Sequence, residues 1–220
     1  MRIAVDLDGV VFDFEESWRQ CAEQVLHREI RRRGTSYNLR KCFQLTQMEH
    51  DKVWAAFHLS NRWQRLPAIP SAVEALRMMK DLGHSLSFVT QLAVRDETLR
   101  YQMTQERKAS LEREGLMGIS NGGSLVVVQG TKSAALGRIQ PMFYADDRWP
   151  FCLDARFAQV PFIAHIQSDH DGDGMPIDGV ESFTTLADAI RTFAQVTRPS
   201  CSFGALAVGE KFFKKGEVYA

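Results

Sequence analysis

The chain has 220 residues, 45% of them hydrophobic and 25% charged, and its formal net charge is zero. This length suits one core domain with a smaller inserted unit. Because the charges balance and no long apolar span or signal-peptide pattern occurs, we expect no membrane partner and find no strong nucleic-acid signal.

The first predicted element is a short apolar strand over residues 3–5, followed at once by two acids. Residues i and i+2 of an extended chain share a face roughly 6–7 Å apart, so Asp6 and Asp8 point into one space while Leu7 points away. Two neighbouring acids are costly unless a cation or a catalytic role compensates. Gly9 allows a sharp turn and the close approach of a ligand to its amide.

Residues 14–68 predict a mostly helical insertion after this strand. Apolar residues at helical spacing predict one helix over about 14–32 and another over about 48–59, with a loop around 34–38 between them. The proline-containing stretch 66–70 breaks the helical pattern and predicts a return linker.

From residue 71 onward, helices and strands alternate. Ser71 is predicted to cap a helix over 72–82, and Gly83 ends it. The later elements are a strand at 85–90, a helix at 96–114, a strand at 124–128, a helix at 132–138, a strand at 142–145, a helix at 150–158, a strand at 160–165 and a helix at 184–196. This alternation indicates a parallel sheet with helices on both faces, whose ligands bind beyond the carboxyl ends of the strands.

Four motifs carry a resemblance to a known family. Residues 6–11, Asp-Leu-Asp-Gly-Val-Val, resemble the first motif of the haloacid dehalogenase (HAD) superfamily, which consists mostly of Mg²⁺-dependent phosphatases with an aspartate nucleophile. Thr90 at a strand end resembles the Ser/Thr motif, and Lys132 resembles the motif-three lysine. The pair Asp146 and Asp147 resembles motif four, and all four motifs stand in family order over roughly residues 1–195.

The resemblance implies an α/β fold: a HAD-like Rossmannoid parallel sheet with helices on both faces and a small helical cap inserted after the first strand. With its small helical cap directly after the first motif, the chain resembles most the 5′(3′)-deoxyribonucleotidase-type branch of the superfamily. The expected domains are a catalytic core over 1–13 and 69–197, the cap over 14–68, and a C-terminal tail over 198–220. The tail matches no family motif, so its role and the oligomeric state stay open, with a homodimer contact as one alternative.

The resemblance also implies site roles. Asp6 would attack phosphorus and form an aspartyl-phosphate, while Asp8 would protonate the leaving alcohol and then activate water. Mg²⁺ would be held by Asp6, by the Asp8 backbone carbonyl and by Asp146, because carboxylate and carbonyl oxygens are hard ligands. Asp147 would hold the metal's waters or orient the lysine.

The remaining expectations concern the phosphate and the lysine. Thr90 would hydrogen-bond a phosphoryl oxygen, with free amides near Leu7, Asp8 and Gln91 assisting, and Gly9 and Gln91 would contact the substrate. Lys132 would neutralise charge on the nucleophile and phosphate. Lys108, on the preceding helix, is the competing candidate for the lysine.

The expected partner is a small phosphorylated substrate, with nucleoside 5′-monophosphates as the leading class. Phe14 and Phe43 are candidate substrate contacts, although aromatic residues at helical spacing are more often part of a core. Another small phosphate ester, a phosphorylated polynucleotide end and a catalytically silent binding module remain alternatives. A binding module without catalytic activity would not need both Asp6 and Asp8, so the presence of both acids favours an enzyme.

Two further patterns concern the cysteines and an acidic segment. The four cysteines, at positions 21, 42, 152 and 201, form no Cys-x-x-Cys pair, so reduced thiols in a cytoplasmic protein are the simplest interpretation. Residues 169–178 resemble the first half of a calcium loop, but Val180 stands where a bidentate Glu is expected. An acidic loop is therefore favoured there over a cation site.

Overall fold

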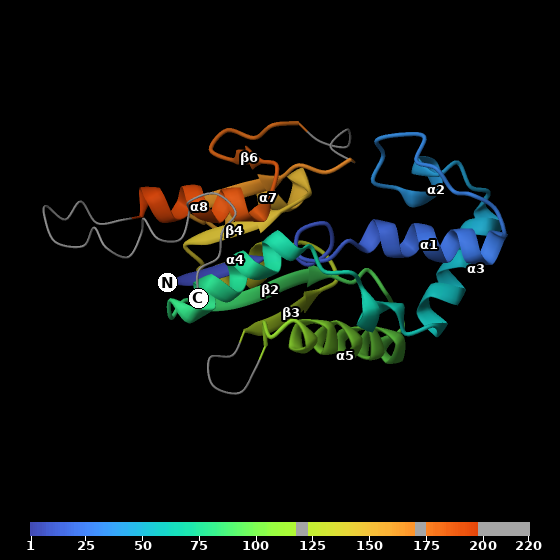
Figure 1. Ribbon diagram of the computed structural model, residues 1–220. Coiled ribbons are helices and arrows are strands. Elements are labelled where there is room, and N and C mark those ends of the chain that lie inside the picture. Colours follow the sequence, from blue (N-terminus) through green and yellow to red (C-terminus); the bar gives the residue numbers. More distant parts are fainter. Residues whose placement is uncertain (118–122, 170–174, 198–220) are drawn as a thin grey trace, which may run out of the picture.

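The computed structural model describes residues 1–117, 123–169 and 175–197. One parallel sheet runs through it in the order β3-β2-β1-β4-β5-β6 (Figure 1). Its strands are β1 (Arg2–Val5), β2 (Ser85–Gln91), β3 (Ser124–Val128), β4 (Phe143–Asp146), β5 (Phe162–Ile166) and β6 (Glu181–Phe183). The chain builds outward from β1 to β3 and then returns to the other side of β1. This reversal places a topological switch point beside β1, where open α/β sheets bind ligands.

Helices cover both faces of the sheet, which confirms the predicted fold class. The helices are α1 (Phe14–Leu26), α2 (Leu39–Cys42), α3 (Gln47–Leu59), α4 (Pro70–Asp81), α5 (Glu97–Arg113), α6 (Ser133–Ile139), α7 (Trp149–Phe157) and α8 (Leu186–Val196), with a 3₁₀ turn η1 (Arg62–Arg65). On one face α4 and α8 pack together, and on the other α6 packs beside α7. Strand β1 shows the alternation, because Ile3 and Val5 belong to one apolar cluster and Ala4 to the other.

The helices between β1 and β2 lie beyond one end of the sheet, to its right in Figure 1. Helices α1 and α3 pack against each other around buried aromatic side chains such as Trp18 and Phe57. The two chain crossings to this helical segment lie side by side, because the Asp13 amide donates to Pro67 O at 2.8 Å and the Ile69 amide to Val11 O at 2.9 Å. The helical character expected of residues 14–68 is thus present, and their role as a separate cap remains a prediction.

Two predicted helix boundaries are wrong. The helix expected over 14–32 ends at Leu26, where His27 adopts a left-handed conformation with φ of 51°. Arginines at 28, 31 and 32 would be i,i+3 and i,i+4 neighbours in a longer helix, and like charges at that spacing are destabilising. Ser71 does not cap α4, because Pro70 occupies the first turn and Ile69 is the N-cap residue.

Three short elements, α2, η1 and β6, were not predicted. The expectations for the tail over 198–220, for Cys201 and for residues 170–174 of the acidic loop at 169–178 lie outside the described residues.

Candidate active site

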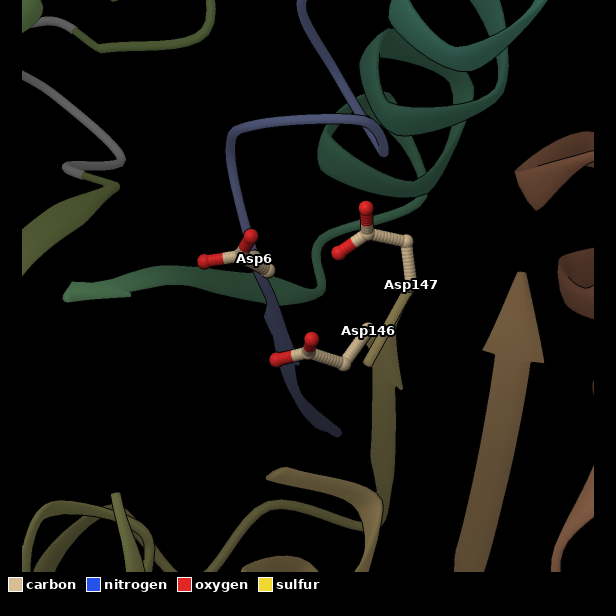
Figure 2. A group of neighbouring side chains, drawn as sticks. All are labelled: Asp6, Asp146 and Asp147. Atoms are coloured by element: carbon tan, nitrogen blue, oxygen red, sulfur yellow. The ribbon is translucent and has the colours of Figure 1, made fainter. Parts of the chain in front are cut away.

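Three buried acids meet at the carboxyl ends of β1 and β4 (Figure 2). The strands are paired in register, with Val5 opposite Ala145, and the Asp6 amide donates to Ala145 O at 2.9 Å. Asp6 therefore emerges beside Asp146 and Asp147. One carboxylate oxygen from each acid lies within 4.8 Å of the others. Sequence reasoning named all three, and the strand register brings them together.

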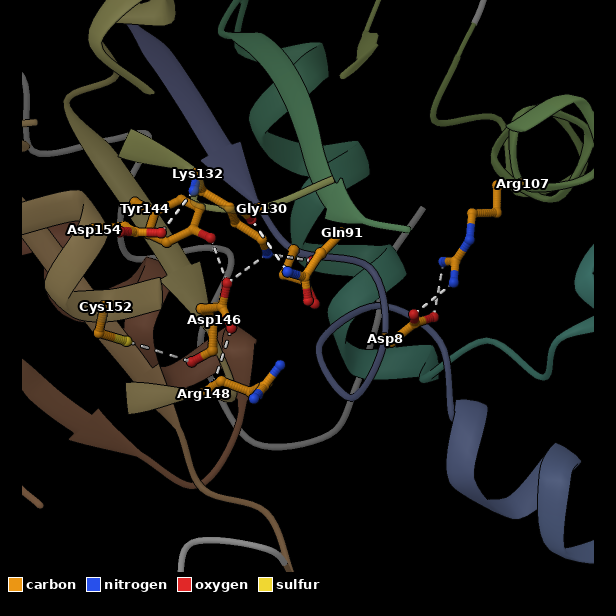
Figure 3. A network of polar contacts seen from close by, with 11 residues as sticks. Asp8, Gln91, Arg107, Gly130, Lys132, Tyr144, Asp146, Arg148, Cys152 and Asp154 are labelled. Carbon is orange, nitrogen blue, oxygen red and sulfur yellow. Dashed lines mark hydrogen bonds and ion pairs between the residues drawn. The ribbon is translucent and has the colours of Figure 1, made fainter. Parts of the chain in front are cut away.

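Lys132 joins two of these acids. Its Nζ donates to Asp146 Oδ2 at 2.7 Å (Figure 3) and to Asp6 Oδ1 at 2.6 Å. The Lys132 side chain is fully buried. The competing Lys108 is about half exposed on α5, where it lies 3.9 Å from Glu112. Lys132 is therefore the lysine that shares the acid cluster.

Three residues that sequence reasoning missed hold this pair of contacts in place. Asp154, on α7, accepts the backbone N–H of Lys132 at 2.6 Å. The Lys132 ammonium lies 4.4 Å from the centre of the Phe151 ring, a cation–π contact. Tyr144, on β4, donates its hydroxyl to Asp146. No sequence motif marks Asp154 or Tyr144, because their partners are defined only by packing.

Burial governs the electrostatics of the cluster. Burial raises the pKa of Asp6 to about 7, against the opposing attraction of Lys132, and the neighbouring Asp146 and Asp8 raise it further. Burial likewise raises the pKa of Asp146, again opposed by Lys132. For Lys132 burial alone would lower the pKa, but attraction to both acids outweighs it and the pKa rises.

The donor set fits a hard divalent cation. The ammonium group of Lys132 contacts two of the three carboxylates, Asp6 and Asp146, so two buried acids face a single positive charge. Magnesium prefers such oxygen ligands and retains waters at its other positions. Within the described residues, this is the one group of three potential metal ligands at such spacing.

Gly9 is required by the loop that follows β1. Its φ is +76°, and a Cβ built on it would lie 2.3 Å from Asp147 Oδ2. Both its conformation and its close approach to Asp147 therefore disfavour a side chain at this position. The Gly9 amide itself donates to Phe12 O at 2.9 Å within this loop.

Asp8 faces a different direction from the acid cluster. Its carboxylate accepts two bonds from Arg107 on α5, at 2.8 and 2.6 Å (Figure 3). Sequence reasoning missed Arg107. Its only sequence signal is an arginine in a helix without a clear apolar stripe, which is too weak to single it out.

Thr90 and Gln91 end β2, next to β1. Thr90 is buried, and the Gln91 side-chain amide donates to Gly130 O at 3.2 Å, in the turn before Lys132. Both therefore lie at the strand end where they were expected.

A cavity of about 750 Å³ opens beside the acids. Its lining includes Asp8, Gly9, Gln91, Arg107, Asp147 and Arg148 from the core and Phe14, Tyr37, His50, Trp54, His58 and Trp63 from the helical segment. Phe14 stacks on Trp63 with ring centres 5.2 Å apart. Phe43 does not line this cavity, since it is buried within the helical segment and stacks on Trp18.

Comparison with protein families matches residues 1–131 to the family described as 5′ nucleotidase, deoxy (pyrimidine), cytosolic type C protein. The match covers more than half of the chain. The chain belongs to this family. It is accordingly a HAD-type phosphatase of the nucleotidase type, as the resemblance predicted. A search of curated proteins found no match.

Solved structures share the fold at low sequence identity. A HAD family hydrolase from Deinococcus radiodurans, with bound phosphate and sodium, is 14% identical with a TM-score of 0.56, over 89% of this chain and 95% of that one. A putative haloacid dehalogenase-like hydrolase from Burkholderia xenovorans is 12% identical with a TM-score of 0.55, over 88% and 96%. The D,D-heptose 1,7-bisphosphate phosphatase from B. bronchiseptica, complexed with magnesium and phosphate, is 12% identical with a TM-score of 0.51, over 89% and 98%. These likenesses confirm the HAD-like fold.

Among the helices that the structure describes, none is both long enough and apolar enough to cross a bilayer.

Proposed function

We propose that the protein is a Mg²⁺-dependent phosphomonoester hydrolase that acts through an aspartyl-phosphate. The single observation that carries the proposal is the contact of Lys132 with both Asp6 and Asp146, at 2.6 and 2.7 Å. A buried lysine between two acids orients a carboxylate and compensates charge, which are the two requirements of phosphoryl transfer.

Asp6, Asp146 and Asp147 would hold Mg²⁺, together with the backbone carbonyl of Asp8. The bound cation would supply positive charge to the phosphoryl oxygens. Lys132 would place a second positive charge beside Oδ1 of Asp6. This contact would fix the orientation of the carboxylate, and so the direction of its attacking oxygen.

The protein's own residues divide the reaction into two steps. A carboxylate oxygen of Asp6 bonds to phosphorus as the ester P–O bond breaks, and Asp8 gives a proton to the leaving alkoxide. Asp8 then takes a proton from water, whose oxygen attacks phosphorus and releases Asp6 and inorganic phosphate. Thr90 and the amides near Leu7, Asp8 and Gln91 would hold the phosphoryl oxygens.

Nucleoside 5′-monophosphates are the proposed substrate class. Membership of a nucleotidase family supports this, as does an aromatic cavity wall that includes Phe14, Trp54 and Trp63. Residues 14–68 would act as the cap that closes over the leaving group. The word cytosolic in the family description supports a cytoplasmic location.

The test is hydrolysis of an aryl phosphate with and without Mg²⁺, in wild type and Asp6→Asn. We expect Mg²⁺-dependent turnover that Asp6→Asn abolishes. Equal inertness of both proteins over a broad phosphate panel would favour the silent binding module. The nucleotide assignment would fail if sugar phosphates turned over far faster than any mononucleotide.

A further inference from the structure

Arg107 forms a forked ion pair with Asp8 (Figure 3). Its Nη1 donates to Asp8 Oδ1 at 2.8 Å and its Nη2 to Asp8 Oδ2 at 2.6 Å. The Arg107 side chain is 2% exposed, whereas that of Asp8 is 20% exposed and faces the cavity. One buried cation therefore fixes the direction of both oxygens of a carboxylate that is open to substrate.

Arg107 is itself held rigidly. Its guanidinium lies 4.4 Å from the centre of the Trp63 ring, a cation–π contact. The Trp63 indole N–H in turn donates to His58 Nδ1 at 3.2 Å. The Trp63 ring and the Asp8 carboxylate leave the planar guanidinium of Arg107 little freedom to rotate. Lysine has no planar group with two parallel donors, so it cannot reproduce this arrangement.

Helix α5, which carries Arg107, is also tied to η1 at other points. Ser110 Oγ donates to Trp63 O at 2.8 Å. Arg113 donates to Gln64 O at 2.6 Å and to Leu66 O at 2.8 Å. Arg113 thus contributes to the same helix-to-turn attachment as Arg107 but bonds to backbone oxygens rather than to Asp8, which makes it a matched control.

We propose that Arg107 is a positioning residue that holds the Asp8 carboxylate in one orientation at the cavity wall. This inference rests on the proposed function, in which Asp8 exchanges protons with the leaving oxygen and with water. A group in that role must lie within about 2.6–3.2 Å of the atom it serves. An aspartate has two rotatable bonds, and the fork of Arg107 fixes the carboxylate against rotation about both.

A double-mutant cycle between Arg107→Met and Asp8→Asn tests this directly. The assay is the steady-state rate on an aryl phosphate, whose good leaving group keeps the rate of Asp8→Asn measurable while hydrolysis of the aspartyl-phosphate still requires Asp8 to take a proton from water. We expect Arg107→Met to lower kcat about 10- to 100-fold when Asp8 is present and by less than about threefold in the Asp8→Asn background, with KM little changed. Equal losses in both backgrounds would overturn the positioning role, because Arg107 would then act independently of Asp8.

Arg113→Met supplies the structural control. Arg113→Met should change kcat by the same factor in the wild-type and Asp8→Asn backgrounds. Thermal unfolding of each variant reports folding, and if Arg107→Met does not fold, Arg107→Lys takes its place in the cycle under the same criterion, since it keeps the charge and loses the fork. Turnover that survives Asp6→Asn would overturn both the proposed function and the role of Arg107. If Asp6 is required but the losses from Arg107→Met and Asp8→Asn are additive, only the positioning role of Arg107 is overturned.

Discussion

The ammonium group of Lys132 lies 2.6 Å from Asp6 Oδ1, although 126 residues separate the two in the chain. The loop before α6 delivers the lysine and the end of β1 delivers the acid, so the contact exists only when the sheet is complete. It joins the proposed nucleophile to the ammonium group that the acid cluster shares, and several measurable consequences follow.

Replacement of Lys132 by Met should lower kcat by at least about 100-fold, the scale seen when one preorganised charge stabiliser is removed. The reason is that Asp6 and Asp146 would lose their shared counter-charge in a buried place. Lys108→Met is the control, because that side chain is half exposed and should leave the rate unchanged. A larger loss in Lys108→Met than in Lys132→Met would contradict the assignment.

Stability without metal should depend on pH through Asp6. Its pKa is about 7 in the folded protein against an ordinary value of 3.8. Between pH 3.8 and about 7, Asp6 holds a proton in the folded state that it has lost in the unfolded state. The contribution of Asp6 to the free energy of unfolding is therefore complete below pH 3.8 and is lost as pH rises through about 7. Melting curves in a chelator at several pH values should show this fall for wild type and a smaller one for Asp6→Asn. The same pH dependence of the melting temperature in wild type and Asp6→Asn would contradict the prediction.

Magnesium should raise the melting temperature, and more so at pH 8 than at pH 6, because binding requires Asp6 to be ionised. A ligand at 100 times its Kd stabilises by about 2.7 kcal/mol. Asp146→Asn should lose most of the shift, since it removes a proposed ligand. A shift that is equal in the variant and the wild type would place the ion elsewhere.

Gly9→Ala should damage both stability and turnover. The added Cβ would lie 2.3 Å from Asp147 Oδ2, and the backbone φ of +76° is unfavourable for alanine. Strain of this kind costs about 1–3 kcal/mol, and we expect at least a tenfold loss of kcat. Gly34→Ala is the matched control, because a Cβ added at Gly34 would meet nothing within 4 Å. Equal behaviour of the two variants in melting and kinetic assays would count against this account.

Phe14 and Phe43 should differ in their effect on nucleotide binding. Phe14 lines the cavity, while Phe43 is buried against Trp18. Stacking of a base on an aromatic ring contributes about 1–3 kcal/mol, so Phe14→Leu should raise KM for a nucleotide by about tenfold. Phe43→Leu should lower the melting temperature and leave KM nearly unchanged. The reverse pattern would remove Phe14 from the substrate contacts.

Much of the fold was predictable because its signals are local. Alternating apolar runs and helical spacings located β1 to β5 and the longer helices, since each pattern depends on residues only a few positions apart. The short elements α2, η1 and β6 have too few residues for such a pattern. Their conformation depends on the neighbours they pack against, as η1 depends on α5.

Local patterns in the chain were enough to indicate which acids end the strands, because Asp6, Asp146 and Asp147 directly follow or end apolar runs and parallel strands align their carboxyl ends. Long-range packing was needed to establish that Lys132 rather than Lys108 meets them, that Phe14 but not Phe43 lines the cavity, and that Arg107 holds Asp8. Those contacts join residues up to 126 positions apart, so they depend on strand order, register and helix rotation, which no short stretch of sequence encodes.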